Sequence, residues 1–208
     1  MAGTGRDRFH VVEGGADKPG SGDLPQVSTG QLGMIIFLIS LGVLFAGTMA
    51  GYLIVRFNND TWRTAEQPGL PLGLLASTLF ILTASVALHR AVSGIRKNNV
   101  DTLRLWLVAA FVLALGFLAG QTLNWLALVH RDLAPNSKSL YAFTFYMLTG
   151  VHALHVVGGF VPLGICVRNA YRGTYSSLSH RGVRYCAQYW HFLDVVWILM
   201  LSVMWAVT

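Results

Sequence analysis

The chain has 208 residues, of which 54% are hydrophobic and only 12% are charged, with a formal net charge of +6. Soluble domains carry a charge on about a quarter of their residues, so this composition excludes an ordinary soluble domain and indicates an integral membrane protein. The basic excess does not predict nucleic-acid binding, because the Lys and Arg residues are dispersed between apolar runs and form no basic face interleaved with aromatic residues.

The first part of the chain, residues 1–29, is polar and rich in Gly, Ser and Pro. Such a stretch buries too little apolar surface to fold alone, so we expect a flexible tail. It lacks the apolar core of a secretory signal peptide, and the first apolar run is therefore expected to stay in place as an uncleaved anchor. Residues 30–208 are expected to form one transmembrane domain.

Five apolar runs follow, each long enough to cross a hydrocarbon core that needs about 20 residues of helix. None alternates with a period of two, and an unpaired sheet edge is costly in lipid, so helices are expected rather than strands. The predicted fold is an all-α bundle of five transmembrane helices. The expected spans are residues 31–56, 69–90, 104–129, 139–167 and 184–207.

The distribution of Lys and Arg predicts the orientation in the membrane. Three of these residues lie in the tail, four in the second connection and four in the fourth, whereas the first and third connections have four between them. Because Lys and Arg gather on the cytoplasmic side, we expect a cytoplasmic N-terminus and a C-terminus outside.

Two GxxxG patterns predict close helix packing within the bundle. Gly47 and Gly51 form one in the first span, and Gly116 and Gly120 form the other in the third. Small residues at this spacing let two helix backbones approach each other.

An acid interrupts the last apolar run. Asp194 is the only one of nine acidic residues inside a long hydrophobic segment, and His191 lies one turn earlier on the same helical face. An ionised carboxylate there costs roughly several kcal/mol unless it is paired, hydrogen-bonded or protonated. The fourth span carries His152 and His155 at an overlapping depth. We therefore predict a structural polar cluster of His152, His155, His191 and Asp194, in which His155 or His152 satisfies the acid and Tyr146 is a further partner.

Other functions compete for these histidines. Haem ligation needs facing histidines on two helices, and bis-histidine cytochromes with two haems usually carry ligands well separated along each helix, but His152 and His155 are three residues apart. A proton or ion pathway needs a relay to both surfaces, and the first three spans contain no carboxylate. We favour a packing role without catalytic, cofactor-binding or metal-binding residues, while a haem b membrane anchor and a small carrier remain alternatives. Cys166 and Cys186 predict neither a structural disulfide at the cytoplasmic side nor a zinc site.

Two long motifs resemble subunit III of the haem-copper terminal oxidases. Residues 189–197, YWHFLDVVW, are similar to the family signature YWHFxDxVW, and residues 145–159 resemble FYxLTGxHxLHVxxG. Residues 116–125 include a match to the FLxxQ part of the family motif GxxFLxxQxxEY, and the likeness covers roughly residues 30–208. Five spans resemble the short form of the family, which lacks two N-terminal helices.

The resemblance implies a non-catalytic accessory subunit of a cytochrome c or quinol oxidase in aerobic electron transport. Such a subunit binds subunits I and II in the inner or plasma membrane of a prokaryote, and holds no cofactor itself, haem and copper being expected in subunit I. The family also implies phospholipid in a helical cleft, with support of O2 access, proton uptake and durable turnover. Arg168 lies where the family has a basic residue that contacts lipid phosphate, for which a guanidinium is suited. A plain cytoplasmic anchor is the alternative role for Arg168.

The chain departs from the family pattern at two positions. Leu41 follows Ser40 where the family has a glutamate, and Asn124 precedes Trp125 where it has Glu-Tyr. Both changes remove an intramembrane acid, which argues against a role in buffering protons. They also keep open a divergent paralogue, such as the subunit associated with nitric oxide reductases.

Overall fold

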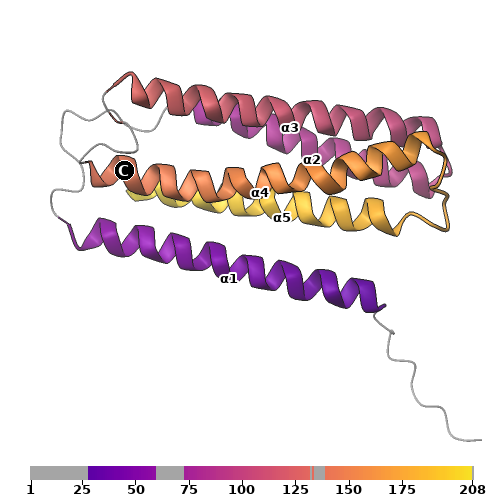
Figure 1. Ribbon diagram of the computed structural model, residues 1–208, viewed down its shortest axis with the longest axis horizontal. Coiled ribbons are helices and arrows are strands. Elements are labelled where there is room, and N and C mark those ends of the chain that lie inside the picture. The colour runs from indigo at the N-terminus through magenta and orange to yellow at the C-terminus, as the bar shows by residue number, and fades with distance from the viewer. Residues whose placement is uncertain (1–27, 60–72, 132, 134–138, 208) are drawn as a thin grey trace, which may run out of the picture.

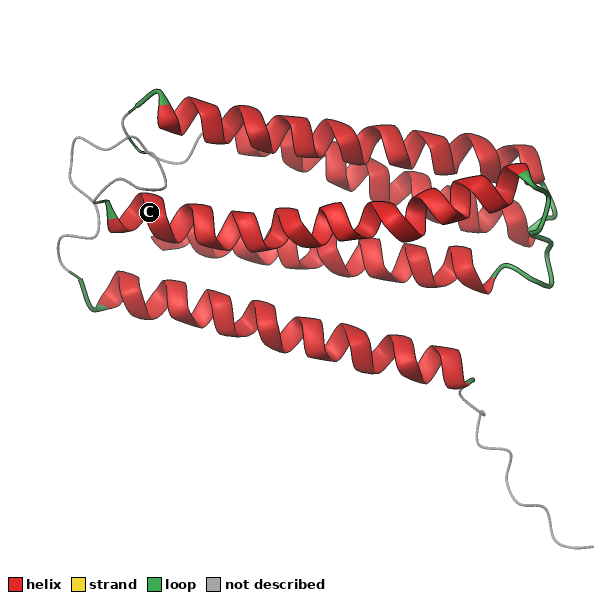
Figure 2. Ribbon diagram, viewed as in Figure 1, coloured by secondary structure: helices red, strands yellow, loops and turns green. Residues whose placement is uncertain are grey.

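The computed structural model describes residues 28–59, 73–131, 133 and 139–207. Figure 2 shows that these residues form helices and their connections, without a strand among them. Five helices are long and apolar enough to cross a membrane, which confirms the predicted all-α membrane bundle. They are α1 (Thr29–Phe57), α2 (Gly73–Arg96), α3 (Val100–Val129), α4 (Leu140–Tyr171) and α5 (Arg181–Val207).

The helix ends follow local chemistry rather than the limits of the apolar runs. α2 continues beyond the predicted residue 90 and ends before Asn98, whose φ of 56° is left-handed; its predicted start at residue 69 lies outside the described residues. The Asn99 side chain then caps α3 by accepting a hydrogen bond from the Thr102 amide. α4 runs on to Tyr171, and the chain turns at Gly173 with a φ of 69°.

Successive helices run in opposite directions along an elongated bundle (Figure 1). The start of α1 and the α2–α3 and α4–α5 connections lie at one end, and the end of α1 and the end of α5 lie at the other. We call the first of these the arginine-rich end, because it carries Arg96, Arg104, Arg168, Arg172 and Arg184. The predicted orientation requires these connections to lie on the same side of the membrane as the start of α1, as they do here. The orientation relative to the cytoplasm stays a prediction.

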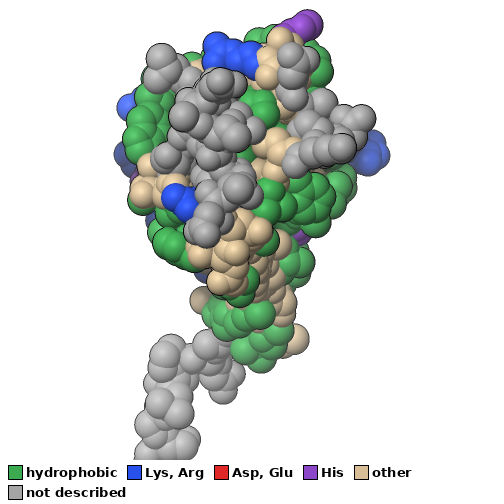
Figure 3. Space-filling model, turned by 90° about the vertical axis from the view of Figure 1, so that its left-hand side faces the viewer, with side chains coloured by type: hydrophobic (Ala, Val, Ile, Leu, Met, Phe, Trp, Pro, Cys, Tyr) green, Lys and Arg blue, Asp and Glu red, His purple; other side chains and the backbone are tan. Residues whose placement is uncertain are grey.

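Helix α1 is attached only to α4 and α5. Its buried residues are few, namely Leu41, Phe45 and Tyr52. Most of its other apolar side chains are exposed, as expected for a surface in contact with lipid or another subunit. Figure 3, viewed from the opposite end of the bundle, shows this hydrophobic helix projecting from the body that the other helices form.

The two GxxxG patterns have different surroundings. A Cβ atom added at Gly116 would lie 2.9 Å from the Phe80 ring of α2, and one added at Gly120 would lie 3.1 Å from Ser77. The pattern in α3 therefore does pack closely against α2. Added Cβ atoms at Gly47 and Gly51 would meet nothing within 4 Å, so the close packing expected for the first span is wrong for contacts within this chain.

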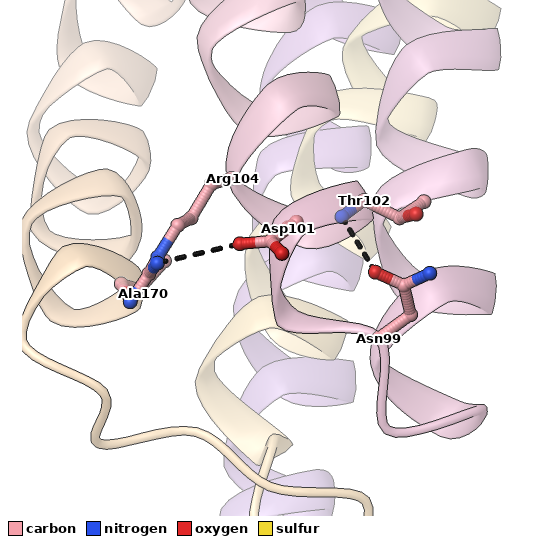
Figure 4. Close-up of polar contacts among 5 residues, drawn as sticks. All are labelled: Asn99, Asp101, Thr102, Arg104 and Ala170. Carbon is pink, nitrogen blue, oxygen red and sulfur yellow. Dashed lines mark hydrogen bonds and ion pairs between the residues drawn. The ribbon is translucent and has the colours of Figure 1, made fainter.

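At the arginine-rich end, Arg104 connects the start of α3 to the end of α4 (Figure 4). Its Nε donates a hydrogen bond of 3.0 Å to the Ala170 carbonyl, and its Nη1 lies 3.5 Å from the Asp101 carboxylate. Because Asp101 is exposed, most of the stabilisation comes from the bond to Ala170. Arg104 thus links the start of α3 directly to the end of α4.

Candidate functional site

The acid of the last span lies inside the bundle beside a histidine of its own helix. Asp194 is 4% exposed, and neither carboxylate oxygen has a hydrogen-bond partner among the described residues. His191 Nδ1 lies 3.8 Å from Asp194 Oδ2, which is an ion-pair distance but too long for a hydrogen bond. The same nitrogen is 2.6 Å from Ser85 Oγ of α2. Ser85 of α2 and His191 of α5 are therefore the polar groups found beside Asp194.

The two histidines of α4 do not satisfy the acid by hydrogen bonds. His152 is 0% exposed, and both of its ring nitrogens are without a hydrogen-bond partner among the described residues. His155 donates from Nδ1 to the Val151 carbonyl of its own helix, at 2.7 Å, and Tyr146 donates to the Trp125 carbonyl. His155 Nδ1 and the Tyr146 hydroxyl are thus bonded to backbone carbonyls, and the predicted hydrogen bonds to Asp194 are absent among the described residues.

Aromatic rings from three helices surround His152. The ring centroids of Trp197, Phe117 and Phe45 lie 5.1, 5.9 and 6.0 Å from its own. The predicted polar cluster is therefore divided: His191 and Asp194 form a pair between α2 and α5, while His152 belongs to an aromatic core.

Trp197 is the centre of that aromatic core. Its ring meets Phe117 edge-on at 5.2 Å, and its Nε1 donates a hydrogen bond of 2.9 Å to Thr78 Oγ1 of α2. Hydroxyls within a helix usually bond to their own helix, and the cluster predicted from the sequence accordingly included no hydroxyl of α2. Thr78 does so as well, donating to the Leu74 carbonyl. The sequence could have indicated this contact through Trp197, because a buried indole N–H needs a hydrogen-bond acceptor.

An apolar groove lies among α1, α4 and α5, with a volume of about 420 Å³. Its lining residues are Met34, Phe37, Gly158, Pro162, Gly182, Tyr185, Cys186 and Tyr189. Arg168 is exposed and is not among them. It follows Pro162 by six residues, which places it about 9 Å nearer the arginine-rich end and about a third of a turn away around α4.

A family model described as cytochrome c oxidase subunit III matches residues 20–207 of the chain. The chain belongs to the cytochrome c oxidase subunit III family. It is 33% identical over 181 residues to cytochrome c oxidase subunit 3 of Thermostichus vulcanus, covering 85% of this chain and 87% of that protein. It is 34% identical over 172 residues to the Synechocystis sp. protein of the same name, covering 82% and 72% of the two chains. These relatives and the five apolar helices make this subunit III a multi-pass membrane protein.

In the described part of this subunit III, no group of three or more His, Cys, Asp or Glu residues could hold a metal ion. The two cysteines are buried and unbridged, and Tyr175 lies beside one of them, with its hydroxyl 3.7 Å from Cys166 Sγ. Burial raises the pKa of Tyr175 to about 12, so its hydroxyl stays protonated and remains a donor at neutral pH.

Replacing His191 by leucine is expected to lower the free energy of unfolding by about 1–2 kcal/mol. The change removes the group nearest to Asp194 that can carry a positive charge, and leaves a buried acid alone. The effect is below that of a fully buried pair, because the His191 side chain is 39% exposed.

Combining H191L with D194N should restore part of the loss, since a neutral amide needs no counter-charge. Thermal unfolding of the wild type, both single variants and the double variant gives the coupling energy between the two residues. Strictly additive effects would contradict a structural pair.

Proposed function

We propose that this chain is the non-catalytic subunit III of a respiratory cytochrome c or quinol oxidase, where it stabilises subunit I in aerobic electron transport. The observation that carries the proposal is the family match along residues 20–207. The bundle supports it, because buried aromatic groups pack its helices against one another, as Trp197 of α5 does with His152 of α4 and Thr78 of α2. Subunits I and II are the proposed partners, with haem and copper in subunit I, and the plasma membrane of a prokaryote is the proposed location.

In this proposal the histidines and Asp194 stabilise the packing of the helices and take no part in a reaction. The pair of His191 and Asp194 fixes α5 against α2 through Ser85, and His152 packs where α4 meets the aromatic rings of α3 and α5. His155 contributes to the contact with α1, since its ring lies 5.1 Å from that of Phe45.

The apolar groove among α1, α4 and α5 is the proposed place of a phospholipid chain. Its walls are aromatic and aliphatic, and it is about as large as the pockets that hold drug-sized ligands. Arg168 is the proposed contact for the lipid phosphate, because it lies at the arginine-rich end, about 9 Å beyond Pro162 along α4. An apolar groove also dissolves O2 better than water does, which supports the proposed role in O2 access.

The proposed support of proton uptake depends on groups other than the two carboxylates of the family pattern. Leu41 and Asn124 stand in their places, and both side chains are buried. Asp194 is the remaining buried acid in the described residues.

Removing this chain from the purified oxidase tests the proposed function. The haem and copper spectra of the remaining complex and its initial turnover should be unchanged, while activity should decay faster during sustained turnover. Mass spectrometry of the intact complex should identify the chain beside subunits I and II. A Soret band that travels with the isolated chain would contradict the proposal and favour a haem b anchor. Transport by the chain alone would favour a carrier.

A further inference from the structure

A polar pocket lies between α2 and α5 at the arginine-rich end, separate from the apolar groove. Its volume is about 230 Å³. We call it the α2–α5 pocket, and its lining residues are His89, Val92, Ser93 and Arg96 of α2 with Arg184, Ala187, Gln188 and His191 of α5. Two helices thus contribute a guanidinium and an imidazole each to one cavity.

Two arginines make the α2–α5 pocket positive, and the ion-pair contact of its lining residues with a described acid is that of His191 with Asp194, at 3.8 Å. No carboxylate lines it, and neither Arg96 nor Arg184 forms an ion pair with a described acid. Two guanidinium groups that face one cavity repel each other unless an anion lies between them. Arg184 also lies in the first turn of α5, where the helix dipole adds partial positive charge. The pocket therefore favours an anion.

The lining residues lie at two depths. Seven residues separate His89 from Arg96 and also His191 from Arg184, which is about 10 Å along each helix. The arginines lie near the ends of their helices, which the predicted membrane orientation places at the level of the lipid headgroups, and the imidazoles lie deeper along the bundle. A guanidinium binds phosphate oxygens in a bidentate manner. Imidazole N–H and amide groups, by contrast, also suit uncharged acceptors such as ester carbonyls.

We propose that the α2–α5 pocket binds a membrane phospholipid, with its phosphate between Arg96 and Arg184 and its ester carbonyls near His89, Gln188 and His191. The presence of polar groups at two depths favours a phospholipid over free phosphate. Free phosphate would bind to the two arginines and leave the deeper histidines and Gln188 without a ligand. The two depths also favour a phospholipid over an acidic segment of another subunit, because carboxylates would not need the deeper donors. The proposal does not depend on the lipid proposed for the apolar groove, because that groove and this pocket share α5 but no lining residue.

The test uses the intact oxidase complex with Arg96 and Arg184 both replaced by glutamine. The matched control replaces Arg172 and Arg181, which are exposed at the same end and do not line the pocket. Native mass spectrometry should show one bound phospholipid fewer in the R96Q/R184Q complex and no change in the control. When delipidated complex is titrated with phosphatidylglycerol, this site should bind at least about tenfold more weakly in R96Q/R184Q, since each charged hydrogen bond contributes about that factor.

Four results would overturn the proposal: an unchanged lipid count in R96Q/R184Q, an equal loss in the control, a loss of inorganic phosphate in place of lipid, or release of another subunit with no lipid lost. Should the double variant fail to assemble, R96K and R184K carry the test. These keep the charge but lose the bidentate geometry, so weaker phospholipid binding is expected from each. Wild-type binding in both would overturn the proposal.

Discussion

Replacing Trp197 by alanine is expected to lower the free energy of unfolding by about 3–5 kcal/mol. The side chain is 0% exposed, and its loss would leave a cavity among Phe117, His152 and the helices that hold them. The same change removes the hydrogen bond to Thr78, the direct side-chain link from this position to α2. Thermal or denaturant unfolding of the protein in detergent measures the change. Far-UV circular dichroism should follow the unfolding, because the substitution itself alters the tryptophan fluorescence.

The same helix provides the control for this experiment. Trp205 is 51% exposed and should be replaceable by alanine at a cost of about 0.5 kcal/mol or less. Equal destabilisation by the two substitutions would show that the aromatic core around His152 does not stabilise the bundle.

Replacing Gly159 by leucine is expected to cost about 3 kcal/mol and to separate α4 from α5. A Cβ atom added at Gly159 would lie 2.9 Å from the Tyr189 ring and 3.1 Å from the indole of Trp190, both on α5. Trp190 is fully buried and cannot move aside without disturbing its neighbours, so the larger side chain overpacks the interface. Lower thermal stability and weaker retention by the other oxidase subunits during purification are the expected observations.

Gly164 of the same helix is the matched control, because an added Cβ atom there would meet nothing within 4 Å. G164L should therefore behave nearly as the wild type in both measurements. If G159L and G164L are equally stable, α4 and α5 do not approach each other as closely as the structure shows.

The number and type of helices could be predicted from the sequence, because a run of about 20 apolar residues has one stable form in lipid. Helix ends were less predictable. Residues 91–96 are not strongly apolar, yet α2 continues through them to Arg96, since the chain first turns at Asn98. Local hydrogen bonding, more than hydropathy, decides where such a helix stops.

The partners of the buried polar groups were predicted only in part. Counting residues gives the depth of a side chain along its helix, but not the neighbour that it faces. His155 and Asp194 overlap in depth, yet His155 bonds to its own helix while Asp194 lies near His191. Ser85 was left out of the predicted cluster because hydroxyls in helices usually bond to their own helix. Its bond to His191 depends on how α2 and α5 are rotated toward each other, which the spacing of residues along either helix does not reveal.

The loose attachment of α1 has a consequence for how the protein responds to its surroundings. α2 to α5 enclose their own interior, so the tilt of α1 is set mainly by bilayer thickness and by whatever neighbour lies along its outer side. A thinner or thicker membrane would thus reorient one helix and leave the remaining four in register. Changes in lipid composition would then reach α4 and α5 through the tilt of α1.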